Sequence, residues 1–284
     1  MPQTKRQIQA MLAEAALRPR RRFGQNFMID QNLVRLVADA GDVQADDLVI
    51  EVGPGTGTLT EELLSRGPRV LAVEIDRDLV KLLSERFGPS DRFSLIEGDA
   101  LQAKHELNAQ LSTAIISAAA RNQRVKLVAN LPYNIASPLI IEMLIAGVDL
   151  LAFTVQKEVA DRLRAAPSSG AYGALTVMAK LLSRVEVMRT LPPQAFWPEP
   201  KIESALARMT RDDRIGPRAE GFGRFLQRLF SSRRKTLRKS LSQEGYDADR
   251  LLAGARIDAK LRAEDLAPEQ FLMLFDAAAS ASSE

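Results

Sequence analysis

The chain has 284 residues, enough for an α/β core and a small second domain, and its 39 lysines and arginines against 36 aspartates and glutamates give a formal net charge of +3. It has no cysteine, which excludes disulfides, thiolate zinc sites and a cysteine nucleophile. Its single histidine argues against a histidine-based metal site and against a Ser-His-Asp triad. No metal is therefore expected. No apolar stretch is long enough for a membrane span and the N-terminus lacks the apolar core of a signal peptide, so we expect a cytoplasmic protein without a membrane partner.

The first predicted element is a short amphipathic helix over residues 1–17, followed by a cluster of arginines. Clustered positive charge favours contact with a polyanion, with a solvated surface as the alternative. The next segment, RFGQNFMID, places Gln25 and Asn26 between apolar residues just before a predicted helix. These side chains are positioned either for a ligand or for a helix cap, in which Asp30 would be the capping residue.

The most informative stretch is LVIEVGPGTGTLT, residues 48–60, which predicts a buried strand, a glycine turn and a helix. A P-loop is excluded because no lysine follows the glycines, and the dinucleotide motif fails because its third glycine would fall on Thr58. The spacing G-x-G-x-G, with Glu51 two residues before it, is similar to motif I of methyltransferases that use S-adenosylmethionine (SAM). A glycine turn that only joins a strand to a helix stays open as the alternative.

Two further predicted strands end in acids. Residues 70–76 form an apolar run that contains Glu74, near the position at which doubly wound folds place an acid on ribose hydroxyls, and residues 93–100 lead to Asp99. An acid such as Asp99 can accept a hydrogen bond from an adenine amino group. Together with Glu51, these acids are expected at one carboxyl edge of a parallel sheet, where such sheets bind ligands.

A fourth predicted strand, residues 125–129, runs into Asn130, Leu131, Pro132 and Tyr133. The exocyclic amine of a nucleobase is a poor nucleophile because its lone pair is delocalised into the ring. The side-chain oxygen of Asn130 and the carbonyl of Leu131 could accept its hydrogens and favour a nucleophilic geometry, while Pro132 fixes the backbone and Tyr133 offers a face for a flipped base. An ordinary turn is the alternative.

These motifs together resemble the ribosomal RNA adenine N6-dimethyltransferase family. The similarity rests on FGQNFMID, EVGPGTGTLT, EID, GDA and NLPYNIASP, continues through QKEVA, AYG, PPQAF, PEPKIESA and FSSRRKTL, and covers about residues 5–275. It implies a Rossmann-like SAM-dependent methyltransferase fold, with a seven-stranded, mostly parallel sheet and a small C-terminal all-α domain. Two features depart from the family pattern: Met28 replaces the more usual leucine, and the crossover over residues 101–124 is longer than typical.

The resemblance also implies roles for single residues. Gly53 would lie against the methionine part of SAM, Glu74 would take the ribose and Asp99 the adenine. Asn130 would link the cofactor to the target amine, and Phe196 would face Tyr133 as the second aromatic wall of the base pocket. The residues predicted to bind the cofactor are Gln25, Asn26, Met28, Glu51, Gly53, Gly55, Glu74, Ile75, Asp99, Ala100 and Asn130. The residues predicted to act on the target base are Asn130, Leu131, Pro132, Tyr133 and Phe196. The residues predicted to bind RNA are Arg20, Arg21, Arg22, Arg233, Arg234, Lys235 and Arg238.

The family has two bacterial branches, one acting on two adjacent adenines near the 3′ end of small-subunit (16S) rRNA and one acting on an adenine of large-subunit rRNA in antibiotic resistance. The sequence NLPY and the segment FSSRRKTLRKSL favour the first. We therefore expect a SAM-dependent catalytic domain over residues 1–209 and a small helical RNA-binding domain over residues 210–284, whose stretch 218–239 carries eight lysines and arginines and one acid. The expected partner is the small-subunit rRNA of a 30S assembly intermediate, bound by a monomer.

Three other functions stay open at this point. Related pockets methylate adenine in duplex DNA, and the large-subunit branch shares these motifs. The fold could also serve a ribosome-assembly or transcription factor that needs no catalysis. The presence of Asn130, Tyr133 and Phe196 favours an active enzyme.

Overall fold

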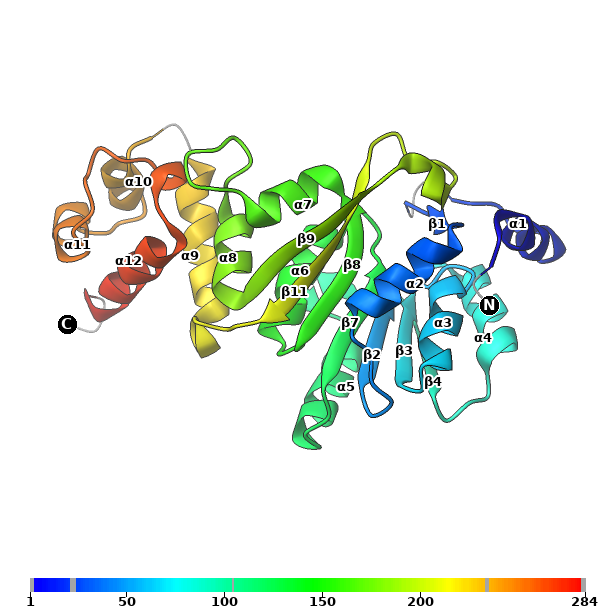
Figure 1. Cartoon of the computed structure of the whole chain (residues 1–284). Coiled ribbons are helices and arrows are strands. Elements are labelled where there is room, and N and C mark those ends of the chain that lie inside the picture. Colours follow the sequence, from blue (N-terminus) through cyan, green and yellow to red (C-terminus); the bar gives the residue numbers. More distant parts are fainter. Residues whose placement is uncertain (1–2, 21–23, 104, 233–234, 282–284) are drawn as a thin grey trace. The chain divides into compact units, whose positions relative to one another are not determined.

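The structure is a computed structural model that describes residues 3–20, 24–103, 105–232 and 235–281 (Figure 1). The chain forms two compact units. The first consists of Met1–Ala160 and Glu186–Arg211, and the second of Asp161–Val185 and Asp212–Glu284. No helix among the described residues has the length and apolar character that crossing a membrane requires.

The first unit is built on a seven-stranded sheet with the order β4-β3-β2-β7-β8-β11-β9 (Figure 1). β4, β3, β2, β7 and β8 run parallel, and β11 pairs antiparallel with β8. The prediction of a mostly parallel seven-stranded sheet is confirmed. The strands are β2 (Leu48–Val52), β3 (Arg69–Glu74), β4 (Phe93–Glu97), β7 (Val125–Asn130), β8 (Leu150–Gln156), β9 (Ser183–Leu191) and β11 (Ser204–Arg211).

The strand order determines where a ligand can bind. From β2 the chain continues outward to β3 and β4 on one side, and then returns to β7 on the other side of β2. Because the crossovers on the two sides diverge from this point, a crevice opens at the carboxyl ends of β2 and β7. Val49, Ile50 and Leu127 are fully buried, as expected of parallel strands covered on both faces.

Helices and two small strand pairs complete the first unit. Asp30 caps the helix that follows it by accepting hydrogen bonds from the amides of Asn32 and Leu33, so the capping interpretation of this residue is confirmed. The helices are α1 (Lys5–Glu14), α2 (Gln31–Ala40), α3 (Thr58–Ser65), α4 (Arg77–Phe87), α5 (Ala109–Ala120), α6 (Ala136–Ile145) and the 3-10 turn η2 (Pro193–Ala195); α7 (Lys157–Arg164) leads out of the unit. The small pairs are β1 (Phe27–Met28) with β10 (Phe196–Trp197), and β5 (Leu101–Ala103) with β6 (Glu106–Leu107).

The second unit is helical and has an aromatic core. The ring of Phe275 lies 5.4 Å from that of Phe222 and 5.5 Å from that of Phe225, and Phe230 lies 5.4 Å from Phe271. Its helices are α8 (Ala174–Leu182), α9 (Ala219–Ser231), α10 (Leu237–Gln243), α11 (Ala248–Gly254) and α12 (Pro268–Ala281), with the 3-10 turns η3 (Gly216–Arg218) and η4 (Ala263–Asp265).

The compact units differ from the predicted domain limits, residues 1–209 and 210–284, because the second unit also takes Asp161–Val185. The hydroxyl of Tyr172 donates a 2.6 Å hydrogen bond to the carbonyl of Leu266, and its ring lies 6.2 Å from that of Phe230. An insertion that packs on helices from the end of the chain cannot be recognised from local sequence.

Candidate active site

The glycine turn lies between β2 and α3, and two of its glycines are required by steric contact. Gly55 has φ +61°, and a Cβ atom there would lie 2.8 Å from the ring of Phe27. Gly57 has φ +79°, and its Cβ would lie 2.4 Å from the ring of Phe87. The turn therefore needs glycine both for its backbone angles and for its close packing.

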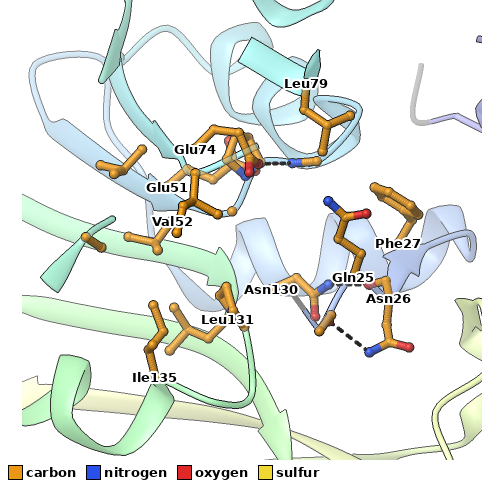
Figure 2. Close-up of a pocket in the computed structure, with 18 of the residues that line it drawn as sticks. Gln25, Asn26, Phe27, Glu51, Val52, Glu74, Leu79, Asn130, Leu131 and Ile135 are labelled. Carbon is orange, nitrogen blue, oxygen red and sulfur yellow. Dashed lines mark hydrogen bonds between the residues drawn. The ribbon is translucent and has the colours of Figure 1, made fainter. Parts of the chain in front are cut away.

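A single cavity at the carboxyl edge of the sheet gathers most of the predicted site residues (Figure 2). All eleven predicted cofactor residues line it, together with Leu131, Pro132 and Tyr133 of the predicted base site. Gly53 and Pro132 bring the two motifs into contact, because a Cβ on Gly53 would lie 3.1 Å from Cγ of Pro132. The cavity thus joins the glycine turn and the NLPY segment in one site.

Two buried carboxyls define the electrostatics of the cavity. Glu51 and Glu74 are 2% and 4% exposed. Burial raises the pKa of Glu51 to about 8, opposed by the 2.6 Å hydrogen bond from Thr60 Oγ1 and reinforced by the charge of Glu74. Burial likewise raises the pKa of Glu74 to about 7, although the amides of Asp76 and Gly55 donate to its carboxylate at 2.9 and 3.4 Å. Both groups change protonation in or near the physiological range.

Another part of the same cavity is lined by apolar residues and by a third acid. Leu79 and Ala100 are 2% exposed, whereas Ile75 is 43% exposed although it lines the cavity. Asp99 is exposed, and one of its carboxylate oxygens accepts a 3.0 Å hydrogen bond from the amide of Leu101. An apolar slot with a carboxylate at its edge suits a flat heterocycle that carries an amino group.

Asn130 is held at both ends of its side chain. Its Nδ2 donates a 2.7 Å hydrogen bond to the carbonyl of Asn26, and its Oδ1 accepts one from the Thr154 hydroxyl (Figure 2 shows the first). An amide oxygen has two lone pairs, so one remains for a ligand. The carbonyl of Leu131 accepts no hydrogen bond from any residue that the structure describes. Two acceptors in fixed positions therefore adjoin the cavity.

The two aromatic residues predicted for the base pocket differ in position. Tyr133 lines the cavity, and its hydroxyl lies 2.7 Å from Oγ of the buried Ser204, which fixes the ring. Phe196 is fully buried in the hydrophobic core and does not line this cavity. Strand alternation in β10 directs Phe196 to the core and its neighbour Trp197 to the other side. The role of Phe196 as a second wall of the base pocket stays a prediction.

Gln25 and Asn26 act through hydrogen bonds within the protein. Gln25 accepts from the amide of Arg20 at 2.7 Å and donates to Asp76 at 3.0 Å. Asn26 donates from Nδ2 to the carbonyl of Gly24 at 3.0 Å. The segment before β1 is thereby fixed to the loop after β3, and it forms one wall of the cavity (Figure 2).

Comparison with known proteins gives the family. A family model described as ribosomal RNA adenine dimethylase matches residues 16–280. The chain belongs to this family. Among its curated relatives, a protein named ribosomal RNA small subunit methyltransferase A from Magnetococcus marinus is 41% identical over 273 residues, covering 94% of both chains. A protein of the same name from Clostridium perfringens is 37% identical over 268 residues, covering 89% of this chain and 88% of the relative.

Solved structures of adenine dimethylases and their relatives share the fold of this dimethylase. The 23S rRNA methyltransferase ErmE is 26% identical with a TM-score of 0.62, covering 89% of this chain and all of the other. A dimethyladenosine transferase from Plasmodium falciparum has a TM-score of 0.64 at 22% identity, covering 86% and 94% of the two chains. The Rossmann-like methyltransferase fold is therefore confirmed, including the helical C-terminal region.

The predicted RNA-binding residues of the dimethylase fall into three groups. Arg20 pairs with Asp76 at 2.6 Å and with Asp78 at 2.5 Å, so its guanidinium is engaged within the protein. Lys235 donates to Gln243 at 2.8 Å, and Arg238 pairs with Asp249 at 2.7 Å while remaining 61% exposed. The remaining four lie outside the described residues: Arg21, Arg22, Arg233 and Arg234.

Several supporting residues of the dimethylase site carry no local motif. Thr154 orients Asn130, Thr60 holds Glu51, and Asp76 joins Gln25 to Arg20. The only available signal for Thr154 is that it is the one hydroxyl in the apolar strand LLAFTVQ. A polar residue on a fully buried strand needs a hydrogen-bond partner, which here is the predicted key residue Asn130.

Proposed function

We propose that this dimethylase transfers methyl groups from SAM to N6 of two adjacent adenosines near the 3′ end of small-subunit (16S) rRNA. The observation that carries the proposal is the doubly anchored amide of Asn130 beside the carbonyl of Leu131, which accepts no hydrogen bond from the described residues, at the point where the cofactor cavity meets Tyr133. The relatives named for small-subunit methylation are 41% and 37% identical, against 26% for the large-subunit enzyme ErmE, which supports the small-subunit branch.

The cavity fits SAM in three respects. The buried carboxylate of Glu74 can accept from two ribose hydroxyls, the slot formed by Ile75, Leu79 and Ala100 matches an adenine ring, and Asp99 can accept from its amino group. The glycine turn allows the backbone to approach the rest of the molecule. When bound, SAM supplies an electrophilic methyl group.

The protein's part in the reaction is to position and polarise the target amine. Asn130 Oδ1 and the Leu131 carbonyl would accept the two amine hydrogens, so that the nitrogen lone pair leaves the plane of the ring and points into the cavity. Tyr133 would stack on the flipped base, as enzymes that modify nucleobases require. The amine can lose its proton after transfer, so the site needs no strong base, and fixed hydrogen-bond acceptors suffice.

We further propose that the substrate is an assembling 30S particle in the cytoplasm and that the enzyme acts as a monomer. Its C-terminal helical region, residues 210–284, would grip RNA through exposed cations such as Arg238. Single-site contact with a large particle does not require a second copy of the enzyme.

The proposal is tested by incubating the purified protein with labelled SAM and unmethylated small subunits, with naked duplex DNA and large-subunit RNA in parallel. Primer extension should show dimethyladenosine at two adjacent positions near the 3′ end of small-subunit rRNA. A single mark on large-subunit RNA, or preferential methylation of DNA, would contradict the proposal. Tight binding of subunits without methyl transfer would instead favour an assembly factor.

A further inference from the structure

A second hollow adjoins the cofactor cavity at Tyr133. Gly24, Gln25, Asn26 and Tyr133 line both spaces, so the two adjoin along this edge of the first unit. The second space is a groove of about 1130 Å³, which exceeds what one small ligand needs. Under the proposed function, a base that stacks on Tyr133 would enter from this groove, and the nucleotide bonded to it would lie there as well.

Trp197 is the second aromatic residue that lines this groove, besides Tyr133. It pairs with Phe27 across the β1 and β10 strands, and the two rings stack with centroids 6.3 Å apart and planes at 26°. Phe27 is buried, whereas Trp197 remains half-buried with part of the indole facing the groove. Because Phe27 packs against one face of the Trp197 ring, the indole is held in place, and its other face is suited to stacking on a base.

The charges of the groove suit a nucleic-acid backbone. Arg18 and Lys201 line it, both are exposed, and neither pairs with an acid among the residues that the structure describes. Among the described residues, Glu199 is the one acid of the lining. Proteins that bind single-stranded nucleic acid without sequence preference combine aromatic side chains, on which bases stack, with cations that contact the backbone.

We infer that Trp197 is the stacking platform for the nucleobase next to the target adenosine, and that Lys201 and Arg18 hold the adjoining phosphates. The inference rests on the proposed function. For two adjacent adenosines, one occupies the cavity while its neighbour stacks on Trp197. Trp197 is thus a specificity-determining residue for paired adenosines, and it stands outside the machinery that transfers the methyl group.

The first test is a cycle of changes in protein and RNA. Small subunits are reconstituted with the neighbouring adenosine kept or replaced by uridine, which stacks more weakly, and kcat/KM is measured for the remaining adenosine. Trp197→Leu should lower kcat/KM about tenfold on the adenosine neighbour, mainly through KM, and much less on the uridine neighbour. Trp197→Phe should recover most of the loss, and Ile116→Ala, at a 67% exposed apolar residue of α5, should change nothing.

The second test uses the fact that Trp197 is the only tryptophan of the chain. Replacing it with 5-hydroxytryptophan gives a probe that can be excited apart from ribosomal proteins, and its fluorescence should be quenched when the enzyme binds unmethylated subunits. Equal losses on both RNAs, or unchanged fluorescence in enzyme shown by sedimentation to be bound, would overturn the inference. Failure of the wild type to methylate any subunit would instead overturn the proposed function.

Discussion

Replacing Glu51 with glutamine should stabilise the free protein at neutral pH although it alters the candidate active site. Glu51 is 2% exposed and its pKa is raised to about 8, chiefly by burial. In the folded state the Glu51 carboxyl therefore keeps its proton over a pH range in which the same carboxyl of the unfolded chain is ionised. Glutamine imitates that protonated form, because its amide oxygen can accept the hydrogen bond from Thr60 just as the carboxyl does.

The magnitude follows from the two pKa values. The folded protein binds a proton at Glu51 up to about pH 8 and the unfolded chain only up to 4.5, so the contribution of Glu51 to the free energy of unfolding falls as pH rises between them. From pH 4.5 to pH 7 the fall is about 3 kcal/mol, at 1.36 kcal/mol for each pH unit. A glutamine side chain does not titrate, so the free energy of unfolding of Glu51→Gln does not fall in this way. Its excess over that of the wild type should therefore grow by up to about 3 kcal/mol over that interval.

The assay is denaturant unfolding of both proteins without cofactor at several pH values from 5 to 8, following the transition of the first unit. Glu97→Gln is the matched control, because it makes the same change at a 51% exposed carboxyl that ends strand β4 of the same sheet. A Glu51→Gln advantage that stays constant from pH 5 to pH 8 would refute the claim that burial holds the proton on Glu51.

Three further predictions concern binding and turnover. Asn130→Ala should lower kcat at least a hundredfold and leave the Kd of SAM within about threefold, measured by single-turnover methylation and calorimetry; equal losses would mean that Asn130 mainly holds the cofactor. Thr154→Val removes the hydroxyl that donates to Asn130 Oδ1, and should lower kcat about tenfold with little change in KM, whereas Thr154→Ser should restore it. Because the pKa of Glu74 is about 7 and its ionised form would accept the ribose hydroxyls, SAM should bind about tenfold more weakly at pH 6 than at pH 8, and Glu74→Gln should weaken that dependence.

The sequence was sufficient to place the cofactor cavity because its residues belong to strand ends. Buried parallel strands appear as continuous apolar runs, and their carboxyl ends must meet at one edge, so Glu51, Glu74 and Asp99 could be grouped before the fold was known. The cavity lining agrees with that grouping residue by residue. The roles of these residues toward SAM remain predictions that the binding experiments test.

The features that could not be predicted depend on contacts between distant segments. Arg20 belongs to a basic cluster, yet it pairs with acids 56 and 58 residues further along the chain. Phe196 and Trp197 are adjacent, and only the pairing of β10 with β1 decides which one faces the core. Register in a strand of two residues leaves no periodic pattern in the sequence.

The two carboxyls of the cavity connect the stability of the free protein with cofactor binding. Burial raises the pKa of both Glu51 and Glu74; the charge of Glu74 raises that of Glu51 further, and the charge of Asp76 raises that of Glu74. Their ionised forms are therefore unfavourable without a counter-charge. The sulfonium of SAM is a cation, so its binding should favour those ionised forms and should release protons near neutral pH. The same burial that destabilises the free protein as pH rises should therefore increase its preference for a positively charged cofactor, and S-adenosylhomocysteine, which lacks the sulfonium charge, should gain less from the pair.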